Sequence, residues 1–149
     1  MRKTGTLGLV LVLTLGLLLL ATAAAFADDD RKLETRLTGA AEVPGPGDPD
    51  GKGEAKIKFK KNFRQLCFEL EVARIAPATA AHVHVAPAGV AGPIVAPLTP
   101  PTNGESEGCV DIDRALGRAI AQHPEEYYVN VHNADFPAGA LRGQLHKDD

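Results

Sequence analysis

Three of the five histidines lie in two short segments, residues 81–85 and 127–132, whose alternating patterns indicate β-strands. Neighbouring side chains of a strand point to opposite faces of the sheet. His82 and His84 therefore share one face of the first segment, opposite its valines, and His132 lies on the polar face of the second. Three neutral imidazoles from two strands suit Cu(II), Cu(I) or Zn(II). The spacing predicts an imidazole cluster on the outer face of a β-sandwich, outside its core.

A structural role for the same histidines stays open beside the metal site. In that interpretation they hydrogen-bond to loops, such as the one that follows His132, and brace them against the sheet. Tyr128 and Asn130 share the polar face with His132, where they would orient a ligand imidazole or make cross-strand hydrogen bonds.

Arg142 is expected to pair with an acid such as Asp135, or to guide an anion. The single serine has no nucleophile-and-base pattern around it, so no residue is assigned a catalytic role.

The rest of the chain predicts the fold that positions these faces. Strand-like runs alternate with turns rich in glycine and proline, which is typical of an antiparallel β-sandwich or Greek-key barrel of about eight strands. Apolar residues then recur at helical spacing after residue 111, which predicts one short helix capped by Asp111 or Asp113 and ended by Pro124. The predicted strands are residues 36–41, 56–59, 66–72, 80–85, 93–98, 107–112, 127–132 and 140–145.

The first residues have the pattern of a secretory signal peptide. Two basic residues precede an uncharged apolar run over residues 7–21, and a small-x-small site ends at Ala27. We expect residues 1–27 to be removed and residues 28–35 to form a flexible leader. An uncleaved anchor is the alternative, because the apolar stretch is long enough to span a bilayer.

Charge and composition exclude several partners. The net charge is −3, no basic run occurs, and cleavage would remove two further positive charges. An acidic domain of this kind does not favour nucleic acid or anionic membrane surfaces. No second apolar segment could insert into a membrane after cleavage. We therefore expect an extracytoplasmic ligand or protein as the partner, in the periplasm or at the cell surface.

The chain has two cysteines, Cys67 and Cys109, each in a strand-like segment. An exported protein meets an oxidising environment, and two cysteines allow a single internal pairing. This predicts a disulfide. Two reduced core cysteines are the alternative, while metal ligation by the pair is disfavoured because no CxxC spacing occurs.

Seven blocks, in this order, carry a resemblance to a known family: residues 37–39, 67–70, 81–84, 92–95, 108–110, 127–132 and 136–145. In them the chain resembles the CHRD domain, a module named from the developmental regulator chordin and also found in bacterial secreted proteins. The last block is long and specific. The resemblance places a CHRD domain at residues 36–147 and implies an extracytoplasmic β-sandwich that serves as a binding or structural module.

A weaker resemblance is to Cu/Zn superoxide dismutase. His82, His84, His132 and Arg142 stand in the order of that family's three copper-ligand histidines and active-site arginine, so a similar topology is suspected. The histidine that bridges copper and zinc has no counterpart here, and neither does the zinc loop. The resemblance implies a copper-only or non-catalytic site. The expected function is thus a secreted CHRD-domain module with a copper or zinc site, and the alternative is a dismutase-like copper enzyme.

Export with cleavage after Ala27 is directly testable. The charged start, the apolar run and the Ala-x-Ala site together direct the chain to general secretion. Mass spectrometry of the protein from its native host should show Asp28 as the first residue. Recovery of intact Met1 in a membrane fraction would mean that the apolar segment is an anchor.

Overall fold

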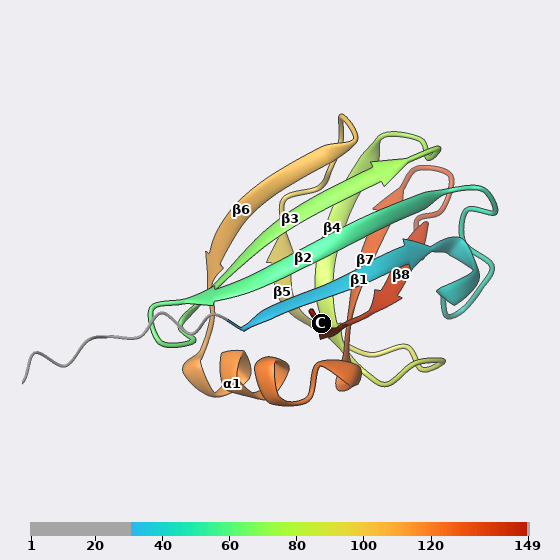
Figure 1. Ribbon diagram of the computed structural model, residues 1–149. Helices are drawn as coiled ribbons and strands as arrows, with labels where there is room; N and C mark the ends of the chain where they lie inside the picture. Colours follow the sequence, from blue (N-terminus) through green and yellow to red (C-terminus); the bar gives the residue numbers. More distant parts are fainter. Residues whose placement is uncertain (1–30, 149) are drawn as a thin grey trace, which may run out of the picture.

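An antiparallel sheet that curls into a nearly closed barrel forms the body of the protein (Figure 1). The computed structural model describes residues 31–148. The strand order is β5-β4-β7-β8-β1-β2-β3-β6, with β9 paired to β1, and the end strands β5 and β6 touch. The predicted all-β, antiparallel fold is confirmed. The strands are β1 (Lys32–Thr38), β2 (Lys52–Lys60), β3 (Gln65–Ala73), β4 (Ala78–Val85), β5 (Ile94–Leu98), β6 (Glu105–Asp111), β7 (Tyr127–Asn133), β8 (Leu141–Gln144) and β9 (His146–Lys147).

Alternate side chains of these strands fill the barrel interior. Leu37 on β1, Ile57 on β2 and Phe68 on β3 all face inward and are buried. Val83 on β4 and Val129 on β7 face inward from the other side of the barrel and are also buried. The burial of such side chains fixes the register, because a slip by one residue would turn each strand's apolar set outward.

The first strand begins earlier than the sequence predicted. Residues 28–35 were expected to be a flexible leader and 36–41 a strand, but β1 already starts at Lys32 and pairs with β2 along its length. Leu33 and Thr35 alternate into the core, and the charged residues beside them lie on the outer face, so the strand alternation already begins within the segment expected to be a leader. The end of the predicted strand is instead a short 3-10 turn, η1 (Gly39–Ala41).

The predicted signal peptide, residues 1–27, lies outside the described residues. Within residues 31–148, no helix is long and apolar enough to cross a membrane.

One short helix, α1 (Arg114–Gln122), covers an end of the barrel, as predicted (Figure 1). Asp113 rather than Asp111 is its cap, with a side-chain oxygen that accepts from the Ala115 backbone N–H at 2.7 Å. The chain then enters a 3-10 turn, η2 (Pro124–Glu126), whose proline prevents continuation. At Gly117 a Cβ would lie 2.2 Å from the carbonyl oxygen of Phe63, so glycine lets the helix approach the β2–β3 turn closely.

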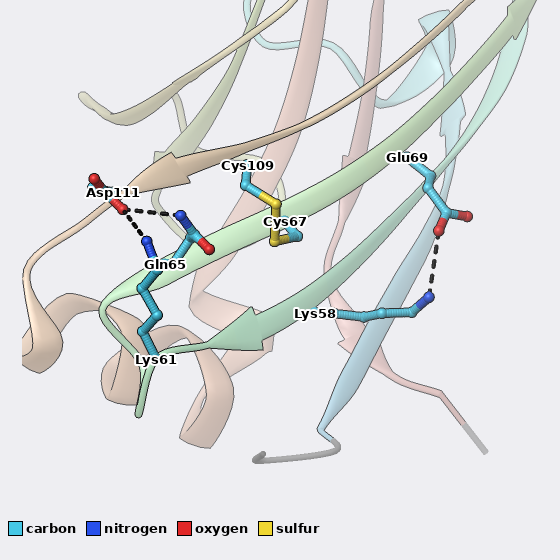
Figure 2. Close-up of a disulfide and its surroundings, with 7 residues drawn as sticks. All are labelled: Lys58, Lys61, Gln65, Cys67, Glu69, Cys109 and Asp111. Carbon is cyan, nitrogen blue, oxygen red and sulfur yellow. Dashed lines mark hydrogen bonds and ion pairs between the residues drawn. A yellow bond between two sulfur atoms is a disulfide. The ribbon is translucent and has the colours of Figure 1, made fainter.

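The predicted disulfide joins Cys67 to Cys109 (Figure 2). The two residues are direct partners in the pairing of β3 with β6, with a Cα–Cα distance of 3.9 Å. They lie on the outer face of the barrel, opposite the buried Leu66 and Phe68, so the alternative of two reduced core cysteines is wrong.

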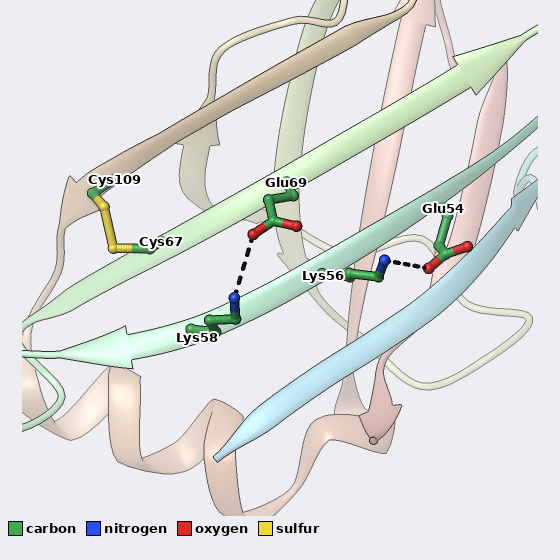
Figure 3. A network of polar contacts seen from close by, with 6 residues as sticks. All are labelled: Glu54, Lys56, Lys58, Cys67, Glu69 and Cys109. Atoms are coloured by element: carbon green, nitrogen blue, oxygen red, sulfur yellow. Dashed lines mark hydrogen bonds and ion pairs between the residues drawn. A yellow bond between two sulfur atoms is a disulfide. The ribbon is translucent and has the colours of Figure 1, made fainter. Parts of the chain in front are cut away.

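Charged side chains surround the disulfide on this outer face. Lys58 lies 3.3 Å from Glu69, and Lys56 lies 3.2 Å from Glu54 along the same strand (Figure 3). These side chains are about half exposed. Ion pairs that are this exposed are screened by water and contribute little, so this face is a solvated surface.

Removing the disulfide should lower stability without abolishing the fold. The bridge closes a sequence separation of 42 residues, so its loss should cost about 2–4 kcal/mol through the freer unfolded chain. The double substitution Cys67→Ala/Cys109→Ala leaves the core beneath intact, and urea unfolding followed by circular dichroism should show this decrease. The wild type with added reductant should match the variant. An unchanged midpoint in both would show that the bridge does not constrain the unfolded state.

Candidate functional site

The register of β4 and β7 brings the three predicted histidines together. His82 pairs with Asn130 across the strands, and His132 pairs with Ala80, so the imidazoles meet on the outer face. One nitrogen from each of His82, His84 and His132 lies within 4.8 Å of the others. This limit is wider than the 4 Å or so expected from metal–nitrogen bonds of about 2.0–2.1 Å. The three imidazoles therefore lie together, with a spacing slightly wider than that of nitrogens bound to one metal ion.

One pair within the triad already has the spacing of metal ligands. His82 Nδ1 and His132 Nε2 are 3.3 Å apart. Two nitrogens on a tetrahedral ion with bonds near 2.0–2.1 Å lie about 3.3–3.4 Å from each other. The same distance also fits a hydrogen bond between the two rings, and the tautomers of the rings determine which nitrogen donates it.

Backbone carbonyls set the tautomers of the other two rings. His84 Nδ1 lies 2.9 Å from the Gly92 carbonyl oxygen, and His132 Nδ1 lies 3.0 Å from that of Pro137. A carbonyl oxygen accepts only, so each Nδ1 carries a proton and each Nε2 keeps a free lone pair. His82 Nδ1–H then donates to His132 Nε2. For His84 and His132 the bracing hydrogen bonds use Nδ1 and leave Nε2 for a metal ion, whereas His82 Nδ1 can bind a metal only when its proton moves to Nε2 and its hydrogen bond to His132 is given up.

His84 presents a buried nitrogen with no partner. The side chain is 8% exposed, and no residue among those described hydrogen-bonds its Nε2. Buried polar atoms are nearly always satisfied, so an unpartnered nitrogen on a ring that clusters with two other imidazoles is the observation that fits a metal ion best.

The predicted accessory residues Tyr128 and Arg142 form a stack with His84. The His84 and Tyr128 rings are 4.7 Å apart and almost parallel, at 9°. The Arg142 guanidinium carbon lies 3.5 Å from the Tyr128 ring centre. Because β4 and β8 flank β7 on opposite sides, the imidazole and the guanidinium approach the tyrosine from opposite sides.

Arg142 does not make the ion pair with Asp135 that the sequence predicted. It is 2% exposed, and its hydrogen bonds among the described residues go to the carbonyl oxygens of Val90 at 2.9 Å and Pro87 at 3.0 Å, and to Gln144 Oε1 at 3.4 Å. Asp135 is an exposed loop residue. Backbone carbonyls that satisfy a guanidinium have no sequence signature, which is why the partner was missed.

The surroundings favour the neutral form of His84 and His82. Burial lowers the pKa of His84, and the nearby His132 and Arg142 lower it further, against the opposing effect of the hydrogen bond to Gly92. Burial also lowers the pKa of His82, with contributions from His132 and His84. Neutral rings retain the lone pairs that a metal ion requires.

Asn130 and a residue that the sequence did not indicate, Glu42, form a buried pair behind this site. Glu42 follows η1, is 5% exposed, and accepts a hydrogen bond from Asn130 Nδ2. Burial raises its pKa to about 7, although Arg142, the Val43 backbone N–H and Asn130 favour its charged form. In the sequence Glu42 is a lone acid beside a proline-rich turn, and nothing there signals its burial.

Fold and site together define a class: a disulfide-bonded, antiparallel β-barrel domain whose histidine-bearing outer face is covered by loops. The family described as the CHRD domain matches residues 33–145. The chain belongs to the CHRD domain family. CHRD domains are extracellular, and the disulfide suggests an oxidising compartment. The match begins at residue 33, inside β1. No curated protein matches the chain.

Glu42 should give stability a distinct pH dependence. Its pKa in the folded protein, about 7, lies above the ordinary 4.5, so folding favours the protonated form. The resulting stabilisation is complete below pH 4.5 and is lost as the pH rises to about 7. Over this window the unfolding free energy of the wild type should fall relative to Glu42→Gln by up to about 1.4 kcal/mol per pH unit.

Urea unfolding of both proteins at several pH values measures this difference, and subtraction removes the effects of His82 and His84. The exposed acid Glu105, as Glu105→Gln, is the matched control and should leave the pH profile unchanged. A constant difference between wild type and Glu42→Gln from pH 4.5 to 8 would mean that folding does not perturb Glu42.

Proposed function

We propose that this CHRD domain is an extracytoplasmic binding or structural module that holds a copper or zinc ion on His82, His84 and His132. The observation that carries the proposal is the buried, unpartnered Nε2 of His84, on a ring that has a nitrogen within 4.8 Å of a nitrogen of each of two further imidazoles. His132 would bind through Nε2 and His82 through Nδ1, the atoms that lie 3.3 Å apart. His82 would then carry its proton on Nε2.

The donor set favours particular metals. Three neutral imidazoles without a carboxylate suit copper and zinc, whereas calcium and magnesium prefer oxygen ligands. His82 and His132 are only partly buried, so a fourth position on the solvent side is open to water or to a group from a partner.

Arg142 favours a binding module over the dismutase-like copper enzyme that is the alternative. An arginine that guides an anion needs free N–H groups at the metal. Here the guanidinium is buried and donates to carbonyls of the loop after β4. The histidine that bridges two metals in the dismutases also has no counterpart in the sequence.

Secretion completes the proposal. The N-terminal pattern of a signal peptide, the family and the disulfide all support a role outside the cytoplasm. The partner would be an extracytoplasmic ligand or protein, consistent with the acidic, non-basic composition.

Copper titration tests the site. The mature wild type should bind one Cu(II) tightly, and His84→Ala should weaken binding by about 100-fold or more, since replacing even a residue that supports a ligand costs 10–100-fold. His146→Ala, which removes an exposed histidine at the chain's end, is the matched control. Affinity should fall with acidification, and because the pKa values of His82 and His84 are lowered, protonation competes with metal below the ordinary 6.5.

Calorimetry and the Cu(II) electron paramagnetic resonance spectrum give the affinity and the number of nitrogen ligands. Equal binding by wild type and His84→Ala would leave the histidines with a bracing role alone. A superoxide assay on the copper-loaded wild type separates the two candidate functions, and rapid turnover would favour the enzyme.

A further inference from the structure

We propose that metal binding at the triad is coupled to the closure of the covering loop, residues 86–93, and that Tyr128 and Arg142 are the positioning residues that transmit this coupling. The inference rests on the proposed metal site and concerns its regulation. It starts from how this loop is held.

The covering loop has no polar side chain with which to hold itself. Its sequence consists of alanine, glycine, proline and one valine. Inside the loop, all of which is described, the backbone makes one hydrogen bond, from Val90 N–H to the Pro87 carbonyl at 3.2 Å. Val90 at its tip is 49% exposed, so opening the loop would uncover little further apolar surface there. The barrel must therefore supply the contacts that keep the loop closed.

Those contacts come from the residues around the metal triad. Arg142 donates to the carbonyls of Pro87 and Val90 in the loop, and Gln144 Nε2 lies 2.8 Å from the Ala86 oxygen at its start. His84 Nδ1 donates to the Gly92 carbonyl near the end of the loop. The Tyr128 hydroxyl accepts from the Gly92 backbone N–H at 3.1 Å. A candidate metal ligand is thus itself one of the groups that hold the loop.

Because Arg142 is buried, opening the covering loop would be costly. A buried cation is costly unless its donors are satisfied. Two of its acceptors are loop carbonyls, so loop opening would leave the guanidinium short of partners. Arg142 packs on Tyr128, and Tyr128 packs on His84, so a shift of the guanidinium alters the surface against which the imidazole lies.

The coupling runs in both directions. Loop opening removes the Gly92 acceptor and frees the tautomer and ring orientation of His84, which weakens metal binding at Nε2. Metal on Nε2 makes Nδ1–H a better donor and fixes the ring, which strengthens the bond to Gly92. Thermodynamic linkage requires the two effects to be equal in free energy.

Hydrogen–deuterium exchange of the mature wild type tests the coupling without any substitution. Zn(II) is the probe because it has no redox chemistry. Saturating Zn(II) should slow exchange of the covering-loop amides about tenfold or more, while the β2–β3 hairpin, remote from the triad, is the internal control and should not change. Unchanged loop exchange with zinc bound would overturn the proposal.

Two variants test the transmitting residues. Tyr128→Phe keeps the ring that stacks on His84 and loses the contacts to Gly92, while Arg142→Lys loses the planar fork that reaches two carbonyls. Each should weaken Zn(II) binding about tenfold or more, by analogy with residues that orient metal ligands. Arg64→Lys, at an exposed position in the β2–β3 turn, is the matched control.

The outcomes separate this proposal from the metal site itself. If Arg142→Lys fails to fold, Tyr128→Phe and the exchange measurement still decide. A lower melting temperature with wild-type zinc affinity in the variants would mean a purely structural role and overturn the coupling. If the wild type binds zinc and His84→Ala does not, but zinc leaves the exchange of the loop amides unchanged, only the coupling proposal is overturned. If the wild type binds neither zinc nor copper, both proposals fail.

Discussion

The pairing of β4 with β7 is the constraint on which the site depends. Val83, Val129 and Val131 are fully buried in the barrel, and their burial determines which side chains point outward from both strands. His82 and His84 are placed on the outer face as a consequence. A slip of either strand by one residue would bury imidazoles and expose valines, so the apolar core enforces the geometry of the polar cluster.

The barrel has two kinds of outer surface. Across β2, β3 and β6, charged side chains such as Lys58 and Glu69 meet water, and their pairs are exposed. Across β4, β7 and β8, loops cover the face, and buried polar groups such as Arg142 find partners mostly in backbone carbonyls. A covered polar face demands specific hydrogen bonding, because every unsatisfied group there is costly. That requirement is what makes the unpartnered nitrogen of His84 informative.

The sequence predicted the features that follow from short-range rules. Strand alternation placed His82, His84 and His132 on a common outer face, helix-end chemistry placed α1, and cysteine count in an exported chain predicted the disulfide. It missed features that depend on packing between distant segments. Glu42 is buried because separate loops close over it, with Gly139 so near that a Cβ there would collide with its carboxyl group. The partners of Arg142 are main-chain atoms, which every residue has and no pattern marks.

The disulfide also lies where the barrel is least continuous. The sheet ends at β6, which is hydrogen-bonded along its length to β3 and meets β5 through limited contacts, next to a bond from the Ser106 hydroxyl to the carbonyl of Thr99 just after β5. A strand at the end of a sheet is hydrogen-bonded on one side, and loss of β6 would expose the edge of β3 as a template for other chains. By joining Cys109 on β6 to Cys67 on β3, the disulfide holds the end strand β6 in place. It thereby protects against strand exchange and aggregation.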